Sequence, residues 1–275
     1  MFKWKTAIGA AMTAAFTGMA TAAMAVPQNY QLGFPAPASD IMTKIESFHQ
    51  LLVVIIVAIC VFVLALLVWI VVRYRAGANP VASKTHHNTL LEVAWTIIPV
   101  IILVLVAIPS FRLLYEEATI PKPDLTIKAI GKQWFWTYQY PGSGDFQFDS
   151  LMLQADAAAK AGKPRLLGVD NPIYVPVNKV VLVETAGADV IHSWSLPQMG
   201  VKMDAVPGRV NRTWFKATQT GVFYGQCSEL CGANHAFMPI EVHVVTDAEY
   251  QAWLATAKTK FAAIDTPDAT RVAAK

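Results

Sequence analysis

The chain has 275 residues, of which 55% are hydrophobic and only 15% are charged. This composition is too apolar for an ordinary soluble protein and favours membrane segments beside a folded domain. The formal net charge is +3, and two of these charges lie in residues 1–25, which contain no acid, so the remainder carries only +1. A chain this close to neutral is not expected to bind nucleic acid.

Residues 1–25 predict a secretory signal peptide. Two lysines form a basic start, small apolar residues follow, and Ala23-Met24-Ala25 is an A-x-A cleavage site. A retained first membrane helix is the alternative, but the Ala-rich core is weakly hydrophobic. Cleavage would leave Val26 at the start of an external arm over residues 26–47. An exported domain behind such a signal predicts a protein of the bacterial inner membrane.

Residues 48–115 are expected to form a transmembrane helical hairpin. Leu51–Val72 and Val93–Phe111 are uncharged, and at 1.5 Å per residue each can cross about 30 Å of hydrocarbon. Ser39 is the expected N-cap of the helix that leads into the first span. The intervening loop contains three basic residues and no acid, so the positive-inside rule places it in the cytoplasm. Both termini then lie on the outer side.

Glu92 lies at the cytoplasmic start of the second expected helix. A carboxylate that faces lipid is costly and is often functional. The alternative is a first-turn acid that the helix dipole stabilises. The residues alone leave both interpretations open.

From residue 112 onward the chain has 16 basic and 16 acidic residues and short alternating apolar segments. Such segments, bounded by turn residues, predict strands over residues 124–130, 133–140, 179–184, 210–217 and 240–245. The absence of βαβ alternation favours an antiparallel sandwich or barrel over residues 116–255. A helix is expected over residues 248–263, and residues 256–275 are assigned to a C-terminal tail.

Residues 225–239, GQCSELCGANHAFMP, place Cys227, Cys231, His235 and Met238 in the spacing C-x3-C-x3-H-x2-M. Two thiolates, an imidazole and a thioether form a soft ligand set, which favours copper because magnesium, calcium and manganese prefer oxygen. A second imidazole has to come from elsewhere in the chain, and His192 is the natural candidate.

Three other interpretations of this segment stay open on the residues alone. Cys227 and Cys231 could form a disulfide in an oxidising compartment. Two Cys and two His could bind zinc, although zinc has no use for Met and the spacing is unusual for a finger. The His and Met could also be packing residues, as is expected of Met199 and Met203 near His192.

The string HSW…MDAVPGR…GVFYGQCSELCGANHAFMPI closely resembles subunit II of aa3-type haem-copper cytochrome c oxidase, and the resemblance runs from about residue 40 to residue 255. It implies a cupredoxin-like Greek-key barrel behind the hairpin, with a binuclear copper A centre. The implied ligands are His192, Cys227, Glu229, Cys231, His235 and Met238. In this set the two Cys bridge both coppers, and Glu229 contributes its backbone carbonyl.

The same resemblance implies that the chain accepts electrons from a periplasmic cytochrome c. It would pass them to haem a of subunit I, for oxygen reduction coupled to proton pumping. Electrons would enter at Trp134 of the Trp134-Phe135-Trp136 run, and Glu92 would lie at the mouth of a proton path. The Glu229 carboxylate would bind magnesium or manganese shared with subunit I. Haem a, haem a3 and copper B belong to subunit I, and subunit III and membrane lipid are the other expected partners.

Acidic residues near the Trp134 run would steer a basic partner. The candidates are Asp145, Asp149, Asp156, Asp170 and Asp189. Gln139 stands where many relatives have an acid, so the docking field is expected to be weaker or suited to a less basic cytochrome. His243 alternates with valines on an expected strand and is interpreted as a solvent-facing residue.

Three other classes of protein share part of this pattern. A quinol oxidase subunit II has the hairpin and barrel but no copper, which the intact Cys-Cys-His-Met set argues against. A tethered copper chaperone or store would not need Trp134 or Glu92. A nitrous-oxide-type reductase requires a large further domain, and there are too few residues here for one. Electron transfer in an oxidase is therefore the preferred interpretation.

Overall fold

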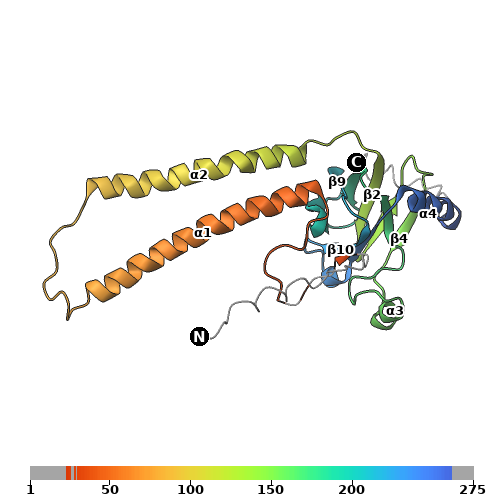
Figure 1. Ribbon diagram of the computed structural model, residues 1–275. Coiled ribbons are helices and arrows are strands. Elements are labelled where there is room, and N and C mark those ends of the chain that lie inside the picture. Colours follow the sequence, from red (N-terminus) through yellow and green to blue (C-terminus); the bar gives the residue numbers. More distant parts are fainter. Residues whose placement is uncertain (1–22, 26–27, 29, 262–275) are drawn as a thin grey trace, which may run out of the picture.

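The computed structural model describes residues 23–25, 28 and 30–261. A long helical hairpin projects from a compact β-sandwich (Figure 1). Most of the expected signal peptide and most of the expected C-terminal tail lie outside the described residues. Of the signal segment, Ala23–Ala25 form the short strand β1, which pairs in parallel with Gly221–Phe223.

The first helix of the hairpin, α1, spans Asp40–Arg73. The prediction that Ser39 is its N-cap is confirmed, because the Ser39 hydroxyl accepts a hydrogen bond from the Met42 N–H at 3.0 Å. The helix that leads into the first span begins at Asp40 and continues into that span without a break. Most side chains of the span are exposed, as a lipid-facing helix requires.

The second helix, α2, spans Thr89–Ala118 and includes Pro99 and Pro109. The side chain of its N-cap, Asn88, accepts a hydrogen bond from the Leu91 N–H at 3.2 Å. Both helices are long and apolar enough to cross a membrane. The predicted two-helix hairpin is thus present, and α1 and α2 run side by side away from the sandwich (Figure 1).

Two sheets form the sandwich. The first has the order β5-β11-β10-β7-β8, with β1 beside β10. The second has the order β4-β3-β2-β6-β9. The strands of the first sheet are β5 (Ile173–Pro176), β11 (Pro239–Val245), β10 (Gly221–Cys227), β7 (His192–Leu196) and β8 (Val201–Ala205). Those of the second are β4 (Gln147–Ser150), β3 (Phe135–Gln139), β2 (Leu125–Lys132), β6 (Val180–Gly187) and β9 (Asn211–Lys216).

Short helices complete this domain. They are α3 (Ala155–Lys160), α4 (Asp247–Lys260) and the 3₁₀ turns η1 (Pro197–Met199) and η2 (His235–Phe237). A capping box starts α4, because the Thr246 side chain accepts from the Glu249 N–H while the Glu249 carboxylate accepts from the Thr246 N–H. The expected terminal helix is therefore present over residues 247–260.

The core lies between the two sheets. Along β2 the exposure of the side chains alternates strictly, as a strand with one buried face requires. Large aromatic residues supply most of the buried area, and Trp136, Trp194, Phe215 and Phe223 are each at most 1% exposed. The alternating pattern of the sequence therefore did predict a layered β domain.

Within residues 116–255, the expectation of an antiparallel domain is wrong for two strand pairs. β2 pairs with β6 in parallel, and β11 pairs with β5 in parallel. The chain leaves the second sheet after β4, forms β5 in the first sheet, and returns with β6 beside β2. Such crossovers bring strands that are distant in sequence into parallel register, which a hairpin cannot do.

Hydrogen bonds join the hairpin to the base of the sandwich. The Ser39 hydroxyl donates to the Met199 carbonyl at 2.8 Å, and the Ala38 N–H donates to the Gln198 carbonyl at 2.8 Å. From the other helix, the Glu117 carbonyl accepts from the Trp214 indole at 3.1 Å. Both helices are therefore attached to the domain at their outer ends.

Candidate metal centre

Two paired strands bring the distant ligand candidates together at one end of the first sheet. His192 is the first residue of β7, and Cys227 is the last residue of β10. The two strands are antiparallel, with Cys227 opposite Trp194. Because the start of one antiparallel strand adjoins the end of its partner, these two side chains are adjacent although they lie 35 positions apart in the chain.

The loop from Cys227 to Met238 supplies the other candidates and is closed at its base. The Cys227 N–H donates to the Met238 carbonyl at 3.2 Å, and the Ser228 N–H donates to the Ser193 carbonyl at 2.9 Å. At the far end, Pro239 begins β11 directly after Met238. The loop is therefore held by β10, β7 and β11 together.

The sulfur atoms of Cys227 and Cys231 lie 3.9 Å apart. A disulfide requires about 2.05 Å, so both cysteines are free thiols. Each thiol has an imidazole beside it. Cys227 Sγ lies 4.0 Å from His192 Nδ1, and Cys231 Sγ lies 3.6 Å from His235 Nδ1.

Two weaker donors complete the cluster. Met238 Sδ lies 3.5 Å from Cys231 Sγ, and the Glu229 backbone carbonyl lies 3.4 Å from Cys227 Sγ. The ligand atoms of His192, Cys227 and Cys231 all lie within 4.8 Å of one another, and all three residues are buried. The donor set is soft and contains two sulfurs that can be shared, which fits copper and not magnesium.

Of the two rival thioethers, Met199 is fully buried in the hydrophobic core and Met203 lies on β8. Their positions agree with the prediction that they are packing residues.

The two thiols differ in acidity. Burial raises the pKa of Cys227, but hydrogen bonds with His192 and with the loop backbone outweigh burial and lower it to about 7. Burial and the neighbouring Cys227 charge raise the pKa of Cys231 to about 12. Burial lowers the pKa of His192, whereas hydrogen bonds with Cys227 and Asp189 raise it to a net value above its usual range. Because a metal binds thiolates, copper would have to displace the Cys231 proton.

Asp189 orients the His192 ring from behind. Its carboxylate lies 2.9 Å from His192 Nε2 and accepts hydrogen bonds from the Val190 and Gln133 N–H groups, each at 2.7 Å. An N–H held at Nε2 leaves Nδ1, the nitrogen that faces Cys227, free to bind a metal. Sequence reasoning placed Asp189 among the docking acids and missed this contact, although its position three residues before His192 was a signal.

Trp134 lies against the metal loop. Its indole N–H donates to the Cys231 carbonyl at 3.1 Å, and the Gln133 side-chain amide donates to the same oxygen at 2.9 Å. The predicted strand over residues 133–140 is wrong at its start, because Gln133 and Trp134 form the turn between β2 and β3. Trp134 is therefore partly exposed, while Trp136 is fully buried with its ring centroid 6.0 Å from that of His192.

The other docking candidates are exposed, and several also cap turns. The Asp145 carboxylate accepts from the Gly142 N–H at 2.9 Å, and that of Asp170 accepts from the Leu151 N–H at 2.8 Å. Asp149 accepts from the Thr137 hydroxyl at 2.5 Å. Asp156 lies in the first turn of α3.

A buried carboxylate cluster lies outside the metal loop. Glu241 on β11 is 1% exposed and lies 3.0 Å from Lys163 Nζ and 2.7 Å from His243 Nε2. Its other oxygen accepts from the Val169 N–H at 2.8 Å. The interpretation of His243 as a solvent-facing residue is therefore wrong, because its ring is partly buried and packs 4.6 Å from that of Tyr174.

Glu92 lies in the first turn of α2, at the end of the hairpin away from the sandwich. Its carboxylate accepts a hydrogen bond from the Asn88 N–H at 3.2 Å, which is a capping interaction. This contact agrees with the interpretation of Glu92 as a first-turn acid. A further role requires a partner that the chain itself does not contain.

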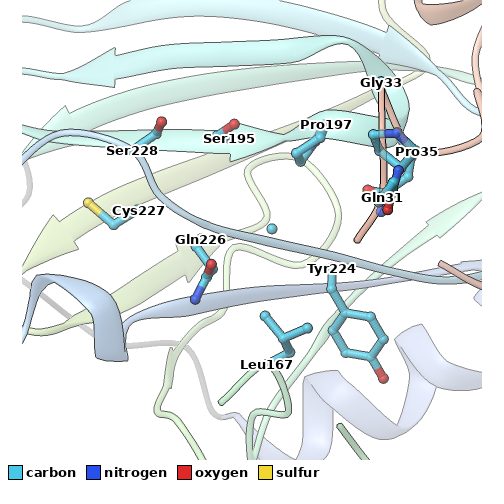
Figure 2. A pocket seen from close by; sticks show the side chains of 12 residues that line it. Gln31, Gly33, Pro35, Leu167, Ser195, Pro197, Tyr224, Gln226, Cys227 and Ser228 are labelled. Atoms are coloured by element: carbon cyan, nitrogen blue, oxygen red, sulfur yellow. The ribbon is translucent and has the colours of Figure 1, made fainter. Parts of the chain in front are cut away.

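A hollow of about 380 Å³ lies on the outer face of the first sheet, next to β10. Figure 2 shows Leu167 and Tyr224 on one side of it, and Gln31, Gly33 and Pro35 of the N-terminal arm on another. The Cys227 thiol is at the edge and points away from Leu167 and Tyr224. Among the candidate ligands, Cys227 therefore borders this hollow at the end of β10.

Two protein-family models match the chain. The model for the cytochrome c oxidase subunit II periplasmic domain matches residues 125–245, and that for the transmembrane domain of the same subunit matches residues 27–113. The chain is 49% identical over 237 residues to the probable cytochrome c oxidase subunit 2 of Rickettsia bellii, which covers 86% of this chain and 87% of that protein.

Two further similar proteins are a subunit 2 sequence and a solved domain. Cytochrome c oxidase subunit 2 of Cereibacter sphaeroides is 42% identical over 279 residues, with 92% of each chain covered. The crystal structure of the periplasmic domain of subunit II of cytochrome oxidase of Bradyrhizobium japonicum is 62% identical. It covers 52% of this chain and 100% of that one, with a TM-score of 0.49.

Proposed function

The chain belongs to the cytochrome c oxidase subunit II family and is a subunit of that oxidoreductase complex, with two transmembrane helices and a periplasmic domain. From this premise we propose that it is the subunit through which electrons enter the oxidase. It receives them from a periplasmic cytochrome c and delivers them to haem a of subunit I, for oxygen reduction coupled to proton pumping.

One observation carries the proposal. Two free thiols face each other across 3.9 Å, each with its own imidazole nitrogen within 4.0 Å. A mononuclear blue-copper site uses one Cys, and a structural zinc site has no role for Met238. Two shared sulfurs with two flanking imidazoles suit a pair of coppers, which when bound would take up and release a single electron.

Each part of the chain has a task in this proposal. Cys227 and Cys231 would be shared by the two coppers, His192 and His235 would each hold one copper, and Met238 and the Glu229 carbonyl would be weaker ligands. The closed loop holds these donors fixed, so that little has to move when the oxidation state changes. Support comes from the short backbone bonds that tie the loop to β7 and β11.

Trp134 is the proposed point at which electrons enter. Its indole is partly exposed on one side and bonded to the Cys231 carbonyl on the other, which supports a short route from the surface to the ligands. Asp145, Asp149, Asp156 and Asp170 are the proposed docking acids, since all four are exposed. We assign Asp189 mainly to orienting His192.

Two further residues act at the border with subunit I. The Glu229 side chain is exposed beside the ligand loop and would bind magnesium or manganese shared with that subunit. Glu92, at the cytoplasmic end of the hairpin, would lie at the mouth of a proton path. The haems and copper B belong to subunit I, and subunit III completes the assembly.

The proposed location is the bacterial inner membrane, with both termini and the copper domain on the periplasmic side. The proposed segments are a cleaved signal over residues 1–25, an arm over 26–47 and the hairpin over 48–115. The copper domain spans residues 116–255, and the tail spans residues 256–275. Arg73 ends α1, and Arg75 and Lys84 lie in the loop that follows, and these basic residues support a cytoplasmic position for that end of the hairpin.

The test uses the soluble part, residues 112–275, refolded with copper. We expect two coppers per chain and an electron paramagnetic resonance spectrum in which one unpaired electron is shared by both nuclei. Cys227→Ser and Cys231→Ser should each abolish the shared signal, whereas Met203→Leu, the matched thioether control, should keep it.

Other results would overturn the proposal. One copper per chain would remove the bridging role of Cys227 and Cys231. No copper, with a Cys227–Cys231 disulfide that persists after reduction and reloading, would favour the copper-free quinol oxidase relatives.

A further inference from the structure

A groove lies between the outer ends of the two membrane helices, directly below the sandwich. It has a volume of about 470 Å³, within the range of small-molecule sites. Apolar side chains form its walls and charged side chains form its rim, and they come from both helices. The residues that matter here are Lys44, Phe48 and Leu51 of α1, and Ile108, Arg112 and Glu116 of α2.

The groove lies where the hydrocarbon of the membrane would end. Leu51 begins the uncharged run of α1, and the uncharged run of α2 ends one residue before Arg112. Its apolar part therefore lies at the depth of acyl chains, and its charged part lies in the headgroup layer. Long basic side chains at this depth extend towards the interface.

The charges in the groove leave one cation unbalanced. Lys44 and Glu116 form an ion pair that joins α1 to α2 across the rim. Arg112 lies one turn before Glu116 on the same face of α2. Its guanidinium is in none of the ion pairs of the described residues. Two cations and one acid leave a net charge of +1, which equals the charge that a single phosphodiester would neutralise.

Basic residues at this end of the hairpin are also unexpected on topological grounds. Lys and Arg are enriched on the cytoplasmic side of membrane helices, and the loop there already contains three. A role in headgroup binding accounts for Lys44 and Arg112 at the outer side, because basic pockets between membrane helices bind lipid phosphates.

We propose that this groove is a binding site for one phospholipid of the outer leaflet. The phosphodiester lies between Arg112 and Lys44, and an acyl chain passes between Leu51 and Ile108. A free phosphate would not use the apolar walls, and an apolar helix of another subunit would leave Arg112 buried without a counter-charge. The proposal rests on the outward orientation of this end of the hairpin.

The position of the site gives the lipid a structural task. Lys44 and Arg112 lie between one and two helical turns from Ser39 and Glu117, the residues whose hydrogen bonds attach α1 and α2 to the sandwich. A lipid held by both helices would therefore fix the spacing of the two attachment points. In this way it would steady the copper domain on the membrane.

The test is photo-crosslinking on the intact oxidase in membranes. One probe is a phosphatidylglycerol with a photoreactive group near the start of an acyl chain, and the second is a diacylglycerol with the same chains but no phosphate. We expect phosphatidylglycerol to label residues 44–51 and 108–116 roughly fivefold more than diacylglycerol. Arg112→Gln should remove this preference, whereas Arg75→Gln at the cytoplasmic end should keep it.

Equal labelling by the two probes in the unmodified oxidase would overturn the proposal without any variant. So would an unchanged preference in Arg112→Gln, or crosslinks from the groove to a peptide of another subunit in place of lipid. If Arg112→Gln fails to assemble, Ser47→Trp fills the groove and keeps all charges, and it should lower labelling to the diacylglycerol level. Copper content in the same samples reports separately on the proposed function.

Discussion

The buried ion pair of Glu241 gives the sharpest test of how the sandwich is held together. In Glu241→Gln the neutral amide can no longer balance Lys163, which has only 21% of its side chain exposed. Removing one partner of a fully buried ion pair lowers the free energy of unfolding by about 3–5 kcal/mol. Because Lys163 is partly exposed, we expect a smaller loss of about 2 kcal/mol. For a domain of this size that loss lowers Tm by roughly 4–8 °C.

The effect should depend on pH in a defined direction. Burial raises the pKa of Glu241, but hydrogen bonds from His243, the Val169 N–H and Lys163 outweigh burial, so its folded pKa lies below the ordinary 4.5. A lowered folded pKa means that the ionised carboxylate stabilises the domain above about pH 4.5. This contribution is lost as pH falls through the folded pKa.

Urea unfolding of the copper-free domain at pH 7 and at pH 4 measures both effects. The difference in the free energy of unfolding between the original domain and Glu241→Gln should be largest at pH 7 and should become smaller towards pH 4. Glu184→Gln is the matched control, because its partner Arg212 is 62% exposed and a surface pair contributes at most about 1 kcal/mol. Equal losses in the two variants, or a gap that widens in acid, would refute the reasoning.

Two further predictions concern the support of His192. A Cβ at Gly131 would lie 2.7 Å from the buried His192 ring, so Gly131→Ala should displace this ligand and cost about 1–3 kcal/mol of stability. Chelator competition should show weaker copper binding in Gly131→Ala. Gly77→Ala is the control and should bind copper like the original chain, because a Cβ at Gly77 would contact nothing. Unchanged copper binding in Gly131→Ala would contradict this prediction. Asp189→Asn should weaken copper binding roughly 10- to 100-fold and change the hyperfine spectrum, because the ring loses its charged partner. Asp145→Asn, whose carboxylate accepts from the Gly142 N–H and is not a proposed support of a copper ligand, is the control for copper affinity. Equal copper affinities in these two variants would argue against an orienting role.

The parts that could be predicted from sequence are those encoded by local pattern. Long uncharged runs predicted both helices, and alternation predicted β2, β6, β9 and β11 to within a few residues. Five of the six proposed ligands lie within twelve residues, and the side chains of four of these five, the two Cys, His235 and Met238, showed their chemistry without a fold. Only His192 lies outside this segment, and its choice as the second imidazole required a guess about which distant part of the chain adjoins the segment.

The strands that carry the ligands could not be recognised by alternation. In β10 five of seven residues are buried, and in β7 four of five are buried. A strand covered on both faces has no period-two signal. The sequence pattern therefore did not predict β7 and β10, the two strands whose pairing brings His192 next to Cys227.

Sequence patterns also did not predict the contacts between distant loops. The carboxylate of Asp189 is shared between His192 and the turn at Gln133, which lies 56 residues earlier. Similarly, Glu241 is covered by a segment around Lys163 and Val169 whose composition gives no sign of it. Polar residues on an alternating strand suggest solvent, and only the tertiary structure reveals that another segment lies over them.

The Cys231 carbonyl oxygen accepts from both Trp134 and Gln133 while its own side chain faces Cys227. The residue proposed to meet a partner protein and a residue proposed to hold metal are thus joined through one atom. Binding at two such sites is linked reciprocally: if a docked partner shifts the indole and changes copper affinity by some factor, copper changes partner affinity by the same factor. A subunit without copper would then differ from the loaded one in its attraction for the electron donor, as well as in its colour.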